Sequence, residues 1–168
     1  LSPEQQFSAH PEQILVHLDE ALLWGCKAKP VLLGPLSFLY LSKLDTQVDD
    51  PSASKLALLD RLLPVYVEIL HAIETKGVSW VQIDEPILAL DLPTEWRDAL
   101  PKVLANLSST PLKILLATYF ENIEQHLPAL ASSPVAGVHI DAVRAPEQVA
   151  TFVRDLPAHQ VLSLGVVN

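Results

Sequence analysis

The chain has 168 residues, of which 49% are hydrophobic and 18% are charged, a composition typical of one well-packed globular unit and not of a disordered or fibrous segment. Its 20 acidic and 11 basic residues give a formal net charge of -9. The sequence has no basic stripe that could bind phosphates, so we exclude nucleic acid as a partner. The single cysteine, Cys26, favours a reducing compartment, the cytoplasm, and no apolar stretch approaches the roughly 20 residues of a membrane-spanning helix.

Strands and helices are predicted to alternate along the chain. Short runs rich in Val, Ile and Leu are typical of buried parallel strands, and apolar stripes with a period near 3.6 indicate helices between them. In chain order we predict helix 11–26, strand 31–33, a polar loop over 41–54, helix 54–76, strand 81–84, helix 94–106, strand 113–118, helix 121–130, strand 137–141, helix 146–155 and strand 161–167.

Particular residues refine these elements. Pro64 lies inside the helix predicted over 54–76 and should kink or divide it, because proline lacks a donor and clashes with the preceding turn. Thr94 is the expected N-cap of the following helix. The three tryptophans, at positions 24, 80 and 96, are expected to pack between helices and sheet.

Repeated β-α-β units indicate right-handed crossovers and a parallel sheet, in either a doubly wound fold or a closed barrel. The spacing between the later strands of the chain suits a TIM-like (β/α)8 barrel, but a complete barrel of this kind takes about 250 residues. About five strands are present here. We therefore expect residues 1–168 to form a single α/β unit that is part of a longer protein, with exposed strand edges that need partners.

Four polar residues at strand ends are the candidate substrate-binding residues: Asp84, Glu85, His139 and Asp141. Ligands of parallel α/β folds bind beyond the carboxyl ends of the strands. Side chains alternate along a strand, so Gln82 and Asp84 share a face, as do His139 and Asp141, and both pairs should point into the barrel. Such a set suits acid–base catalysis, a divalent metal ion or an ammonium group. Purely structural roles, such as a turn cap at Asp84 or a hydrogen-bonded pair of His139 and Asp141, remain open.

Five segments resemble one family in the same order along the chain. They are Lys-Pro-Val-Leu-Leu-Gly-Pro at 29–35, Leu-Leu-Pro-Val-Tyr at 62–66, Trp-Val-Gln-Ile-Asp-Glu-Pro at 80–86, Leu-Ala-Thr-Tyr-Phe-Glu at 116–121 and Gly-Val-His-Ile-Asp at 137–141. The family is the cobalamin-independent methionine synthases, whose members are two fused eight-stranded barrels with zinc and homocysteine in the carboxyl-terminal one. The resemblance implies that this chain is part of the amino-terminal barrel.

The same resemblance implies that the segment has no catalytic residue, metal or cofactor of its own. Thr118 and Phe120 stand where the catalytic barrel has a histidine and a cysteine that bind zinc, and Asp141 falls near a zinc-binding glutamate. A threonine and a phenylalanine cannot replace nitrogen and sulfur ligands. Asp84 matches an aspartate that contacts the amino group of homocysteine, which makes Asp84, Glu85, His139 and Asp141 a vestigial substrate site. Zinc is expected in the carboxyl-terminal barrel of the parent protein.

Three functional hypotheses follow. The first is a non-catalytic amino-terminal segment of a methyltransferase that transfers a methyl group from 5-methyltetrahydrofolate polyglutamate to homocysteine, giving methionine. Its partners would be the remainder of the parent chain and, in the full enzyme, the folate polyglutamate or homocysteine. The second is a metal-dependent hydrolase or lyase that uses the strand-end carboxylates and His139. The third is an interaction module that self-associates through exposed strand edges.

Overall fold

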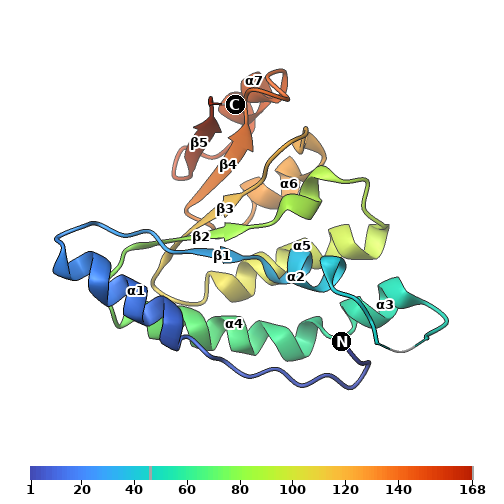
Figure 1. Ribbon diagram of the computed structural model, residues 1–168. Helices are drawn as coiled ribbons and strands as arrows, with labels where there is room; N and C mark the ends of the chain where they lie inside the picture. Colours follow the sequence, from blue (N-terminus) through green and yellow to red (C-terminus); the bar gives the residue numbers. More distant parts are fainter. Residues whose placement is uncertain (46, 168) are drawn as a thin grey trace.

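The computed structural model describes residues 1–45 and 47–167, and a parallel sheet lies at its centre (Figure 1). Its strands lie side by side in chain order, so every crossover moves one place in the same direction. A doubly wound sheet reverses that direction at a switch point, whereas a (β/α)8 barrel does not. The order therefore selects the barrel-type arrangement. The strands are β1 (Val31–Leu33), β2 (Trp80–Asp84), β3 (Lys113–Ala117), β4 (Gly137–Asp141) and β5 (Val161–Gly165).

The sheet is an open segment of a barrel. Within the described residues β1 pairs only with β2 and β5 only with β4, so both outer edges are free. The predicted α/β fold with about five parallel strands of a TIM-like barrel is confirmed. The sheet that these strands form is not closed into a barrel.

The helices pack against one face of the sheet (Figure 1). Strand residues that point toward them, such as Val81 and Ile83 of β2, are fully buried. No helix in the described part of the chain is both long and apolar enough to cross a membrane. The helices are α1 (Glu12–Leu23), α2 (Pro35–Leu41), α3 (Pro51–Leu56), α4 (Leu59–Glu74), η1 (Pro86–Ala89), α5 (Thr94–Leu107), η2 (Glu124–His126), α6 (Leu127–Ala131) and α7 (Gln148–Asp155).

The opposite, concave face of the sheet is partly open to solvent. Its residues follow from the register, in which Val31 lies beside Gln82 and Leu33 beside Asp84. On the two outer strands this face carries exposed apolar side chains: Val31 is 50% exposed, Leu33 43% and Val161 50%. In a parallel barrel such residues fill the interior. The concave face is thus the inside of a barrel wall.

Three local predictions were wrong. The predicted polar loop over 41–54 contains the start of α3, at Pro51, and α2, which lies between β1 and that loop, was not predicted. Pro64 does not divide α4, because buried neighbours such as Leu63 and Tyr66 hold that helix against the core; the break lies before Leu59 instead. Thr94 is the first residue of α5 rather than its cap, and Pro93 precedes it without a side-chain cap.

The tryptophan prediction holds only in part. Trp96 is fully buried, but Trp24 is 77% exposed at the end of α1. Trp80 lies on the concave face, where Lys113 is its neighbour in the register with β3. Alternation along the strand puts Trp80 on the side of Gln82 and Asp84, away from the helices.

Candidate functional site

The carboxyl ends of β2, β3, β4 and β5 carry a connected set of polar side chains on the concave face. Gln82 is its centre. Its amide nitrogen donates to the Asp84 carboxylate at 2.8 Å and to the Tyr119 hydroxyl at 3.1 Å, while its amide oxygen accepts from the Lys29 ammonium at 2.6 Å. Every polar group of the Gln82 amide therefore has a partner, which fixes the positions of the carboxylate and the ammonium around it.

Tyr119, just after β3, closes the set around Asp84. Burial and, secondly, the neighbouring Asp84 carboxylate hold the pKa of Tyr119 above its ordinary value, while the hydrogen bond from Gln82 opposes them. The hydroxyl therefore stays protonated at neutral pH and, besides accepting from Gln82, keeps a proton that it can donate. The phenol ring lies 6.1 Å from the imidazole of His139, so the set continues onto β4.

His139 and Ser163 form the far side of the network. The imidazole Nδ1 lies 2.9 Å from the Ser163 hydroxyl, because the register of β4 and β5 places the two residues side by side. Burial and, secondly, the charge of Lys29 lower the pKa of His139, although Asp141 and Asp84 oppose them. At neutral pH His139 is thus an uncharged group that can donate or accept a hydrogen bond. We call Lys29, Gln82, Asp84, Tyr119, His139 and Ser163 the strand-end network.

Glu85 does not belong to this network. Its side chain is completely buried on the other side of the strand, where its carboxylate accepts hydrogen bonds from the backbone N–H groups of Leu36 at 3.0 Å and Ser37 at 2.7 Å. These are the first-turn donors of α2, which have no partner inside the helix. Glu85 therefore joins the end of β2 to the start of α2, and it is not solvated.

Asp141 lies on the concave side of β4, and its side chain is hydrogen-bonded to backbone groups. Its carboxylate accepts from the N–H groups of Phe120 at 3.1 Å and of Val143 and Arg144 at 2.9 Å each. The bonds from Arg144 foremost, with those from Val143 and Phe120, lower the pKa of Asp141. The side chain ties the turn after β3 to the turn after β4. Among the described residues, His139 is not one of its hydrogen-bond partners, and the Nδ1 of that imidazole lies beside the Ser163 hydroxyl.

The four predicted site residues therefore separate into two groups. Asp84 and His139 share the strand-end network, whereas the carboxylates of Glu85 and Asp141 hold backbone N–H groups elsewhere. Over residues 1–45 and 47–167 no group of three or more His, Cys, Asp and Glu side chains is placed to hold a metal ion. The structure thus does not assemble the metal centre that the hydrolase or lyase hypothesis needs.

The pair predicted to stand in place of zinc ligands also fails as a zinc site. Thr118 is 1% exposed, and its hydroxyl donates to the backbone carbonyl of His139 at 3.1 Å. Phe120 is 52% exposed and offers only a ring. Neither supplies the nitrogen or thiolate sulfur that zinc prefers, so the residues present do not fit the metal.

Sequence reasoning missed Lys29 as a member of the network and did not single out Ser163. Ser163 was within reach of prediction, because it stands two residues after the start of β5 as His139 stands two residues after the start of β4. Lys29 precedes β1, and only the folded chain brings its ammonium to Gln82.

A partial parallel barrel with a polar, carboxylate-containing surface at its strand ends defines the class: a segment of a (β/α)8-type fold, in which ligands ordinarily bind beyond the strand ends. Residues 1–168 match the family of the cobalamin-independent synthase, N-terminal domain, and the chain belongs to this family.

A solved structure agrees with this fold. It is a B12-independent methionine synthase from Shewanella sp. W3-18-1 in complex with selenomethionine, similar at a TM-score of 0.68 and 14% sequence identity. The match covers 98% of this chain and 50% of that one, so the chain spans about half the length of that protein. At this identity the likeness shows the fold alone.

Proposed function

We propose that this chain is a non-catalytic segment of the amino-terminal barrel of a methyltransferase. The parent enzyme transfers a methyl group from 5-methyltetrahydrofolate polyglutamate to homocysteine, in the cytoplasm, and its zinc is held by the carboxyl-terminal barrel. The remainder of the parent chain is the main partner of this segment. Membership of the family of the cobalamin-independent synthase N-terminal domain supports this proposal.

The non-catalytic role is inferred from the contacts that the side chains at the strand ends make. At the positions that resemble zinc ligands, Thr118 is bonded to a backbone carbonyl and Phe120 has no ligand atom. Glu85 and Asp141 serve backbone N–H groups. What remains for substrate is the strand-end network, in which Asp84 is the group that can pair with an ammonium.

Zinc content and activity test the proposal directly. We expect the purified chain to bind no stoichiometric zinc by elemental analysis, and to transfer no methyl group to homocysteine. Stoichiometric zinc together with methyl transfer by this chain alone would overturn the proposal.

A second experiment examines the substrate-facing role in the full-length parent enzyme. Because a binding residue that takes no part in the chemistry changes KM and not kcat, Asp84→Asn should raise the KM for one substrate by about threefold to tenfold with kcat unchanged. Asp91→Asn, an exposed residue beyond β2, is the matched control and should change neither constant. A loss of kcat of about a thousandfold in Asp84→Asn would show a catalytic residue instead.

A further inference from the structure

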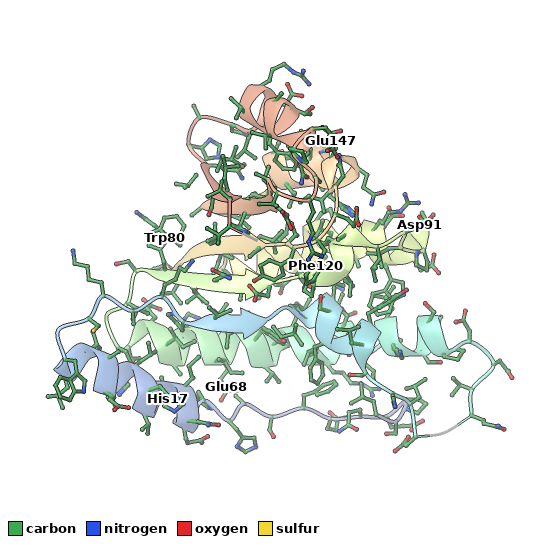
Figure 2. The ribbon with its side chains drawn as sticks, turned by 45° about the horizontal axis from the view of Figure 1, so that its top comes forward. His17, Glu68, Trp80, Asp91, Phe120 and Glu147 are labelled. Atoms are coloured by element: carbon green, nitrogen blue, oxygen red, sulfur yellow. The ribbon has the colours of Figure 1, made fainter. Side chains whose placement is uncertain are left out.

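A cavity of about 680 Å3 lies at the amino-terminal ends of the strands, at the other end of the sheet from the strand-end network. Its walls are the turn after α1, the turn after α4 and the first residues of β2 and β3. Figure 2 labels Trp80 at this end of the sheet and Phe120 toward the opposite end. Cavities of this size accommodate small molecules. The residues that line it are Leu22, Gly25, Cys26, Lys27, Ala28, Lys29, Gly77, Val78, Ser79, Trp80 and Lys113.

The charge of this cavity contrasts with that of the chain. Lys27, Lys29 and Lys113 line it and no aspartate or glutamate does, although acidic residues outnumber basic ones by 20 to 11. In the part of the chain that the structure describes, the lysine–carboxylate pairs involve Lys76 and Lys102. Like charges gathered without a carboxylate raise the local potential and attract an anion.

Two of the three ammonium groups are held in place by uncharged partners. Lys29 donates to the amide oxygen of Gln82 at 2.6 Å, and the Lys113 ammonium lies 5.6 Å from the centroid of the Trp80 ring. Neither contact neutralises a positive charge. These contacts restrict two exposed side chains, which lowers the entropic cost of binding an anion.

Trp80 gives the cavity a flat apolar wall. It is the register partner of Lys113, so the two side chains stand next to each other on the concave face. The indole is only partly buried, and a half-exposed tryptophan beside cationic groups suits a ligand that combines a ring with acid groups.

We propose that this cavity binds a small organic anion whose acid groups are carried on a flat ring. The lysines recognise the acid groups and the indole recognises the ring. Ligands of parallel α/β folds ordinarily bind at the carboxyl ends of the strands, whereas this cavity lies at their amino-terminal ends and shares only Lys29 with the strand-end network. It does not rest on the methyltransferase proposal, and either proposal can fail without the other.

Benzene-1,3,5-tricarboxylate is the probe, and propane-1,2,3-tricarboxylate, which has the same acid groups but no ring, is its control. By calorimetry the aromatic probe should bind with a Kd of about 1 mM or tighter and at least about fivefold more tightly than the control. The affinity should fall as salt is added. In a Trp24→Phe background the probe should change the fluorescence of Trp80, since Trp96 is fully buried.

Variants then locate the site. Lys27→Ala together with Lys113→Ala should weaken binding of benzene-1,3,5-tricarboxylate about tenfold, because each exposed ammonium contributes a few-fold. Lys43→Ala is the control: it removes a charge from an exposed residue after α2 and should leave the affinity unchanged. Circular dichroism verifies that each variant is folded. Absence of saturable binding at about 10 mM, equal affinity for the two probes, or unchanged affinity in the double variant would overturn the proposal.

Discussion

Adjacent residues at the end of β2 have opposite roles, which illustrates how strand alternation distributes function. Asp84 joins the strand-end network, while Glu85 is turned into the core and holds the first turn of α2. Burial raises the pKa of Glu85 to about 7, and the hydrogen bonds from Ser37 and Leu36 oppose this rise only in part. A buried carboxyl group of this kind makes stability depend on pH.

The pKa of Glu85 gives a signed prediction. Because its pKa is higher in the folded chain, about 7 against 4.5, the protonated form stabilises the fold below pH 4.5 and this contribution is lost as the pH rises to about 7. The loss is on the order of 3 kcal/mol. Glu85→Gln cannot ionise, but its amide nitrogen cannot accept the second backbone N–H, so the variant should be less stable than the natural chain at pH about 5 and should lose less stability between pH about 5 and about 8.

Urea unfolding of both proteins at the two pH values measures this difference. His126 and His139, whose pKa values are lowered, titrate in both proteins, so their effect cancels in the comparison. Equal dependence of the free energy of unfolding on pH in the two proteins would contradict the assignment.

A second prediction concerns Gly34, which lies next to the Glu85 carboxyl group. Its φ of -73° is ordinary for any residue, but a Cβ there would fall well inside van der Waals contact with the Glu85 carboxyl group. Gly34→Ala should therefore destabilise the chain by about 3 kcal/mol or more through overpacking. At Gly25, where φ is +71° and nothing lies within 4 Å of an added Cβ, Ala should cost about 1 kcal/mol from backbone strain alone. Thermal or urea unfolding of the two variants measures which is the less stable. A Gly25→Ala variant less stable than Gly34→Ala would refute the prediction.

At the scale of elements, the connection between β3 and α6 is held by a side chain from another strand. Phe120 has a φ of +85°, the one positive value at a non-glycine residue of the described chain, and its N–H is bonded to Asp141. The Arg144 side chain lies 5.1 Å from the Phe120 ring centroid. Contacts from the turn after β4 thus maintain a conformation that the local sequence disfavours.

This strain predicts an inverted preference for glycine. At an ordinary helical position alanine is more stable than glycine, but at position 120 we expect Phe120→Gly to be more stable than Phe120→Ala by about 1 kcal/mol. Both variants lose the ring and its contact with Arg144, so the difference isolates the backbone. Urea unfolding measures it, and a more stable alanine variant would show that φ at this position is not positive in solution.

At the scale of the whole molecule, the sheet is a barrel wall with two free edges and a partly uncovered concave face. Exposed apolar residues on that face and unpaired strand edges favour association with further strands. This property fits a segment that completes its barrel with the remainder of the parent chain, and equally the interaction module of the third hypothesis.

Self-association of the chain can be tested on β5. Val161 is 50% exposed on this edge strand, and Val161→Lys adds a charge where another strand would pair. Sedimentation velocity at rising concentration should show association of the natural chain and less of it in this variant. Val153→Lys, which charges a 66% exposed position on α7, should leave association unchanged. A single monomeric species of the natural chain at every concentration would count against edge pairing.

The parts of the fold that depend on local composition were predictable from sequence. Apolar runs of Val, Ile and Leu located all five strands to within two residues at most, because strands of parallel sheets, which a complete fold covers on both faces, have near-continuous apolar character. The helix α2 was missed, because its first turn is held by Glu85, which is 49 residues away from Leu36 in sequence. Asp84 and His139 were found by their place at strand ends, whereas no local pattern reveals the Lys29 contact with Gln82.

By itself the sequence determined the alternation of strands and helices, the barrel-like class and the family resemblance, since these follow from hydrophobic periodicity and from ordered motifs. Only the tertiary structure decided that Glu85 and Asp141 bind backbone groups while Asp84 and His139 share one surface. It also decided that Lys27, Lys29 and Lys113 surround one cavity. The physical reason is the same in each case: these interactions join residues from different β-α units, and their energies depend on burial and distance that exist only once the strands are paired.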